Sequence, residues 1–145
     1  MVKLRFLVAL ARRITEVNGT VAIPSVRETL GELASEAATV EAFVKAIEIN
    51  GSLDHNGYYV PDLEMITTAQ VVTQRMYPRL MTEIRNLDGG CMIMLPSGIE
   101  DFDDPQLKSY IHATQKSPLL EPFDRVKFFK LAWDAIGSEF ASRHT

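Results

Sequence analysis

Cysteine is nearly absent from this sequence, which has one, Cys91, among 145 residues. One thiol cannot form an internal disulfide and cannot by itself hold a zinc ion or an iron–sulfur cluster, so the sequence favours the reducing environment of the cytoplasm. Histidine is also scarce, and the three histidines lie far apart without a cysteine or carboxylate at the spacing of a metal site. They are His55, His112 and His144. We therefore expect no bound metal.

Long apolar runs and an excess of one charge are missing as well. The apolar stretch over residues 6–11 is ended by Arg12 and Arg13, far short of the roughly 20 residues that a membrane span needs. The net charge is −4, and acidic and basic residues are interspersed, so no basic surface is evident. We expect neither a membrane nor a nucleic acid as a partner.

Apolar residues recur at three- and four-residue steps along most of the chain, which is the spacing of one buried helix face. This pattern predicts helices over residues 4–17, 25–50, 62–88 and 104–116 and from residue 122 onward. With 46% hydrophobic residues, the chain is long enough for one domain with a core. The predicted fold is all-α, a bundle of four to six helices.

Two details of these helices are predicted from single residues. Ser25, with Glu28 three residues later, has the spacing of a capping box and predicts the start of the second helix. Pro78 removes a backbone hydrogen bond inside the third helix, which predicts a kink or break near Tyr77.

The segment Asp88-Gly89-Gly90 is the first candidate binding site. Two glycines at a helix end let a ligand approach closely and leave amide groups free to meet a phosphate. The alternative is a plain helix C-cap, because helices often end this way. A second candidate comprises Gly137, Ser138, Glu139 and Phe140, with a simple hinge as its alternative.

No catalytic residue is evident. Ser97 lacks the preceding glycine of a nucleophile elbow. The acidic residues between 100 and 104 lack the alternating oxygen ligands of a calcium loop, so we interpret them as a turn and a helix cap. Cys91 is interpreted as an inert, buried thiol.

Several motifs, read in order, resemble one family. They are Tyr77-Pro78-Arg79, Asn86-Leu87-Asp88-Gly89-Gly90, Leu95-Pro96-Ser97 with Asp101-Phe102, the run from Arg125 to Asp134, and Gly137-Ser138-Glu139-Phe140. Together they are similar to the C-terminal part of the 4-hydroxyphenylacetate 3-hydroxylase family, whose relatives include chlorophenol monooxygenases and a hydroxylase-like protein of pyoverdine chromophore biosynthesis.

The resemblance implies that residues 1–145 are the C-terminal helical bundle of a longer flavin-dependent hydroxylase, with a fold similar to acyl-CoA dehydrogenases. Such enzymes receive reduced FAD from a separate flavin reductase and hydroxylate a phenolic substrate ortho to its hydroxyl, mainly with side chains of the two domains that this chain lacks. Gly89 and Gly90 match the family's glycines near the flavin pyrophosphate, and Gly137, Ser138, Glu139 and Phe140 match its second contact segment. Where the family usually has three or four glycines, Cys91 and Met92 follow the second one here.

Two functions remain open at this point. In the first, the bundle contributes to flavin binding and to assembly of the hydroxylase as a dimer or tetramer. In the second, it is a non-catalytic module that acts through self-association of its helix faces.

Overall fold

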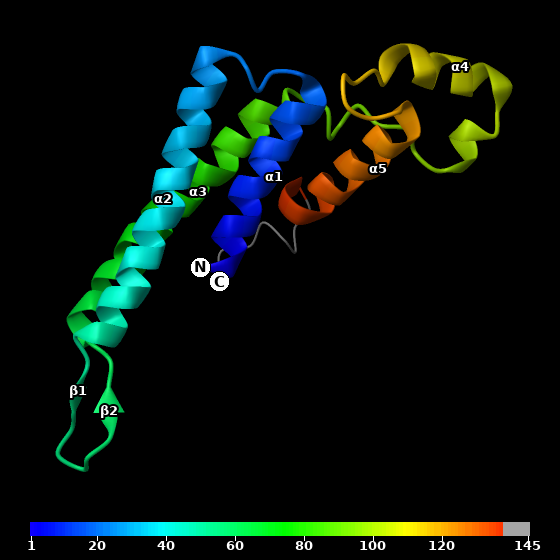
Figure 1. The fold of residues 1–145 in the computed structure, drawn as a ribbon. Helices are drawn as coiled ribbons and strands as arrows, with labels where there is room; N and C mark the ends of the chain where they lie inside the picture. The colour runs from blue at the N-terminus through cyan, green and yellow to red at the C-terminus, as the bar shows by residue number, and fades with distance from the viewer. Residues whose placement is uncertain (138–145) are drawn as a thin grey trace.

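The computed structural model describes residues 1–137 and confirms the all-α expectation (Figure 1). Its α-helices are α1 Val2–Asn18, α2 Pro24–Ile49, α3 Leu63–Asp88, α4 Pro105–Thr114 and α5 Pro122–Ala132. A short antiparallel hairpin, β1 Ser52–Leu53 and β2 Tyr59–Val60, joins α2 to α3. The 3₁₀ turn η1 Glu100–Phe102 precedes α4, and the π-helical turn η2 Trp133–Gly137 continues α5. None of the helices in this part of the chain is long and apolar enough to cross a membrane.

The two longest helices, α2 and α3, lie antiparallel and form an arm that ends in the β1–β2 hairpin (Figure 1). Helix α1 packs against the base of this arm, and α4 and α5 lie on the far side of α1. Fully buried residues of α2 and α3 occur only near the base, up to Val40 in α2 and from Leu80 onward in α3. Within residues 1–137, the half of the arm that carries the hairpin is therefore a helix pair with no third layer over it.

The core lies where α1, the base of the arm and α5 meet. Helix α1 is buried along one face because its apolar residues recur at helical spacing, and Leu7 and Ile14 are almost wholly enclosed. Leu80 and Ile84 from α3 and Phe129 from α5 join them in one cluster. This core fixes α5 against α1, so that α5 lies beside the turn that follows α3.

Most predicted helix ends are confirmed. Gly19 ends α1 with a left-handed φ of 75°, and the side chains of Asp62 and Asp104 cap α3 and α4. The prediction that Ser25 caps α2 is wrong. Pro24 is the first helical residue, because its fixed φ suits that position and its missing N–H is not needed there.

The predicted break at Pro78 is also absent, and α3 runs unbroken from Leu63 to Asp88. Pro78 lies on an exposed face of the helix, as does Gln74, whose carbonyl loses its partner to the proline. Water can satisfy that carbonyl, while the base of α3 is held by α1 and α2. One missing bond does not interrupt a helix that is supported in this way.

Candidate functional site

Helix α3 ends in a turn built by two glycines. Gly89 and Gly90 have φ values of 64° and 88°, a region that residues with a Cβ rarely adopt. A Cβ added at either position would meet nothing within 4 Å, so both glycines face open space. The plain C-cap interpretation is therefore correct as a description of the backbone, and the open space leaves room for a neighbour.

The expectation of free amides at this turn is wrong. The Gly89 N–H donates to the carbonyl of Asn86 at 3.2 Å, and the Cys91 N–H donates to the carbonyl of Asp88 at 3.3 Å. The Met92 N–H donates to Oδ2 of Asp88 at 3.0 Å. The Gly89 amide is therefore used within the helix end, and the Asp88 carboxylate accepts from the loop that follows, so these amides are not free for a phosphate.

Asp88 itself is buried, with 2% of its surface exposed. Burial raises the pKa of its carboxyl group, whereas hydrogen bonds from the backbone of Met92 and Gly90 and the positive charge of Arg125 act in the opposite direction. The burial effect is the largest of these. The turn therefore contains a carboxylate whose charge is only partly compensated.

Arg125 lies in α5 and is buried beside this turn. Its guanidinium donates to Oε1 of Gln115, to Oδ1 of Asn18 at 3.3 Å and to Sγ of Cys91 at 3.2 Å. It also lies over the ring of Phe129, with 4.6 Å between the guanidinium carbon and the ring centre. The expected burial of Cys91 is only partial, because this thiol borders the groove described next.

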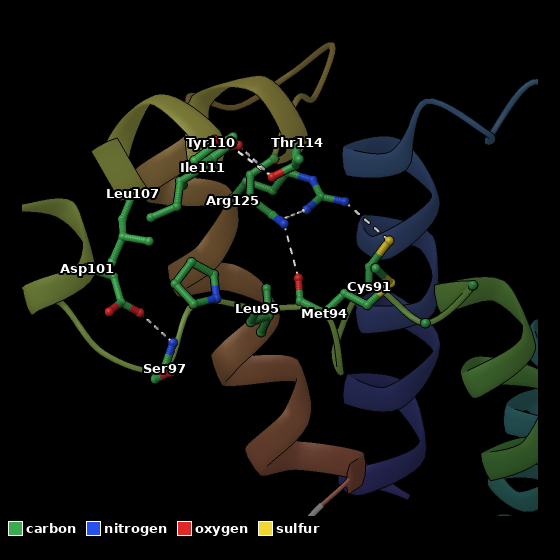
Figure 2. A pocket seen from close by; sticks show the side chains of 14 residues that line it. Cys91, Met94, Leu95, Ser97, Asp101, Leu107, Tyr110, Ile111, Thr114 and Arg125 are labelled. Carbon is green, nitrogen blue, oxygen red and sulfur yellow. Dashed lines mark hydrogen bonds between the residues drawn. The ribbon is translucent and has the colours of Figure 1, made fainter. Parts of the chain in front are cut away.

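Arg125 and the glycine turn line the same groove, which has a volume of about 650 Å³ (Figure 2). Leu107, Tyr110 and Ile111 of α4 form its apolar side, and Gln115 holds the opposite loop by donating to the carbonyl of Met94 at 3.0 Å. The carboxylate of Asp101 accepts from the Ser97 N–H at 2.7 Å and so closes the turn at the groove's edge, as expected for a solvated loop. The groove combines an apolar wall with one buried cation.

The second candidate segment begins next to the first. Gly137 lines a small cavity of about 280 Å³ together with Asp88, Gly90 and Trp133. A Cβ at Gly137 would lie 2.5 Å from the Trp133 ring, so this position needs glycine. Arg85 ties the two segments together by donating to the carbonyl of Ile136 at 2.9 Å. Ser138, Glu139 and Phe140 lie outside the described residues.

The sequence analysis did not single out Arg125, Asn18 or Gln115 as site residues. A signal for Arg125 was present, because it occupies the same helical stripe as Pro122, Val126 and Phe129, which are all buried. A charged residue inside an apolar stripe indicates a buried polar partner or a ligand. Asn18 and Gln115 carry no such signal, since each lies at a helix end. Among residues 1–137, no group of histidine, cysteine and carboxylate side chains is arranged to hold a metal.

The fold is that of the C-terminal helical bundle of acyl-CoA dehydrogenase-like flavoproteins. An archaeal 4-hydroxybutyryl-CoA dehydratase shares it, with a TM-score of 0.82 at 17% identity over 92% of this chain and 27% of that one. This likeness shows the fold alone. The crystal structure of the oxygenase component (HpaB) of 4-hydroxyphenylacetate 3-monooxygenase, complexed with FAD and 4-hydroxyphenylacetate, is more similar, with a TM-score of 0.87 at 26% identity over 97% of this chain and 29% of that one.

A family model described as "4-hydroxyphenylacetate 3-hydroxylase C terminal" matches residues 1–145, and the chain belongs to this family. The oxygenase component of 4-hydroxyphenylacetate 3-monooxygenase from Escherichia coli is 34% identical over 99% of the chain. The pyoverdin chromophore biosynthetic protein PvcC of Pseudomonas aeruginosa is 29% identical over 99% of it. The chain spans only 28% and 29% of the lengths of these two relatives.

Proposed function

We propose that this chain is the C-terminal bundle of a two-component, FADH2-dependent aromatic hydroxylase such as 4-hydroxyphenylacetate 3-monooxygenase. Reduced flavin, delivered by a separate flavin reductase, supplies the oxygen-activating chemistry when it is bound. The role of this bundle is to hold part of the flavin and to help the subunits assemble. The phenolic substrate is bound by the parts of such an enzyme that correspond to the relatives' sequence outside the matched stretch, in the cytoplasm.

The observation that carries this proposal is the groove shared by the glycine turn and Arg125. Its buried guanidinium has an Nε atom without a hydrogen-bond partner in the described residues, and the charge is offset only partly by Asp88. An anionic group entering the groove would meet this charge in a poorly solvated place, where the attraction is strong. The residues present therefore fit a phosphate-bearing ligand, with the guanidinium of Arg125, rather than the amides of the turn, as the attracting group.

Gly89 and Gly90 have a different role in this proposal from the one that the sequence suggested. The Gly89 amide donates within the helix end, and the missing side chains of both glycines leave the space outside the turn open. Gly137 lines the same small cavity as Gly90, so the described end of the second proposed contact segment lies beside the first. The remaining proposed flavin contacts, Ser138, Glu139 and Phe140, lie outside the described residues.

The test is a chimera in which this chain replaces the matching C-terminal part of the Escherichia coli oxygenase component. Calorimetric titration with oxidised and reduced FAD is expected to show binding to the chimera and little binding to the isolated chain. Replacing Gly89 or Gly90 with leucine should abolish binding to the chimera. Gly57→Leu is the matched control, because Gly57 also has a positive φ and open space but lies in the distant hairpin.

Two outcomes would contradict the proposal. One is a folded chimera that binds no FAD. The other is hydroxylation of 4-hydroxyphenylacetate by the isolated chain supplied with reduced flavin, because the catalytic groups would then lie in this bundle.

The second candidate function is a non-catalytic assembly module, and the uncovered half of the α2–α3 arm favours it. A helix pair without a third layer leaves apolar side chains such as Phe43 and Ile47 only half-buried. Under either function we expect the isolated chain to form a dimer or tetramer. A monomer by light scattering at high micromolar protein concentration would contradict this expectation.

A further inference from the structure

The tip of the α2–α3 arm combines exposed apolar side chains with negative charge. Leu53, Tyr58 and Tyr59 of the hairpin are 69%, 71% and 58% exposed. No lysine or arginine occurs between Lys45 and Arg75. The acidic residues of this interval gather around the hairpin and are Glu48, Asp54, Asp62 and Glu64.

A groove of about 660 Å³ between α1 and α2 has the opposite character. Its floor is apolar and includes Val8, Leu30 and Ala37, and its lining carries Arg5, Arg12 and Arg27. Glu41 is the acidic residue of this lining, and it already pairs with Arg5 and Lys45.

The charge of this groove is not neutralised within the described part of the chain. Arg12 shares the carboxylate of Glu16 with Arg13, and Arg27 forms no ion pair with any residue from 1 to 137. The groove therefore presents a positive surface over an apolar floor, complementary to the negative, apolar tip.

We infer that the groove between α1 and α2 binds the β1–β2 tip of a second copy of this chain. The inference rests on the self-association proposed above and adds the surface through which it occurs. The tip supplies what the groove lacks, which is exposed aromatic and aliphatic side chains surrounded by carboxylates. In this arrangement Glu48 and Glu64 of one copy lie against Arg12 and Arg27 of the other.

The geometry of α2 allows both copies to make this contact at once. Arg27, Ala34, Glu41 and Glu48 follow one another at seven-residue steps, so the groove and Glu48 lie on the same side of the helix. Arg27 and Glu48 are about 32 Å apart along α2, from a rise of about 1.5 Å per residue. In a two-fold dimer with antiparallel arms, each tip then reaches the groove of the other copy, and the distal half of each arm gains the third layer that it lacks.

The experiment is a charge exchange in the 145-residue chain, measured by sedimentation and light scattering. The tip variant is Glu48→Lys with Glu64→Lys, and the groove variant is Arg12→Glu with Arg27→Glu. The side chains of Glu48, Glu64 and Arg27 form no hydrogen bond or ion pair within residues 1–137, and Arg12 pairs with Glu16 on the exposed surface of its own helix, so we expect both variants to keep the monomer fold. Each variant alone is expected to weaken the dimer by about tenfold or more, because like charges then face one another.

The decisive sample is an equimolar mixture of the two variants, in which every tip–groove contact is again between opposite charges. We expect the mixture to form a heterodimer and the chain carrying all four changes to form a homodimer. Lys108→Glu with Lys116→Glu, on and just after α4, is the control with the same charge change outside the interface, and it should dimerise as the unmodified chain does.

The outcomes separate this inference from the proposed self-association. A dimer that is insensitive to the tip and groove variants would overturn the inference and leave self-association standing, as expected if the groove were covered by another domain of a longer protein. A monomeric unmodified chain would overturn both. Loss of the dimer in both variants without recovery in the mixture would also refute the tip–groove contact.

Discussion

Replacing Arg125 with methionine should destabilise the bundle in a way that depends on pH. Methionine keeps an unbranched stem next to Phe129 but removes the guanidinium and its hydrogen bonds to Gln115, Asn18 and Cys91. Each buried acceptor left without a donor costs about 1–3 kcal/mol. Because Gln115 borders an open groove, water can reach part of this network. We therefore expect a total loss of about 2 kcal/mol in the free energy of unfolding.

The pH dependence follows from Asp88. Burial already raises the pKa of this carboxyl group, and the charge of Arg125 is one of the effects that lower it. Without Arg125, the folded-state pKa of Asp88 should rise further. A group whose pKa is raised on folding stabilises the protein below its unfolded pKa and loses that contribution as the pH rises through the folded pKa. The loss in the free energy of unfolding caused by Arg125→Met should therefore be larger at pH 8 than at pH 4.

Urea unfolding of Arg125→Met and Arg125→Lys at both pH values tests this reasoning. Lysine keeps the positive charge but not the forked geometry, so Arg125→Lys should lose stability with little dependence on pH. An Arg125→Met deficit that is the same at pH 4 and pH 8 would refute the electrostatic link between Arg125 and Asp88. A deficit below about 0.5 kcal/mol would refute the structural role of the network.

Two further predictions concern the glycines and a carboxylate of α2. Gly89→Ala and Gly90→Ala should each cost about 1 kcal/mol through backbone strain, whereas Gly31→Ala, in open space within α2, should stabilise the monomeric chain by about 0.5–1 kcal/mol. Equal effects at these positions by thermal unfolding would show that the turn is not held in its left-handed form. Burial raises the pKa of Glu36 despite its ion pair with Arg79, so the ionised form is disfavoured in the folded protein. Glu36→Gln should therefore gain stability relative to the unmodified chain at pH 7 but not at pH 4, and a gain of the same size at both pH values would count against this assignment.

The helices could be predicted from the sequence because the signals that define them lie within a few residues of one another. Apolar spacing, the aspartate caps at Asp62 and Asp104 and the left-handed glycines at 19 and 89 all act within a few residues. The errors have the same origin. At the start of α2 two local signals competed, and Pro24 rather than Ser25 set the first residue of the helix. At Pro78, packing of α3 against α1 and α2 outweighed the local cost of the proline.

The sequence indicated two candidate segments but not the side-chain network beside them. The network around Arg125 joins Asn18, Cys91 and Gln115, which are separated by up to about a hundred residues and meet only because α1 and α5 pack beside the end of α3. No periodic pattern in the sequence predicts that residues so far apart come into contact. The family resemblance indicated Gly89 and Gly90, but it did not indicate which acceptors their backbone N–H groups bind.

The position of Asp88 decides what the glycine turn can offer in the proposed flavin site, which is open space rather than its amides. A carboxylate fixed inside the turn accepts from the Met92 N–H and holds the loop that follows, so the turn keeps its form whether or not an anion is near. The same buried negative charge would repel a phosphate if it acted alone. The positive charge of Arg125, on α5, offsets it in part, and Nε of Arg125 has no hydrogen-bond partner in the described residues. Attraction for an anion in this groove therefore depends on an α5 side chain, which makes the packing of α5 against α1 a condition for the proposed binding and not merely for stability.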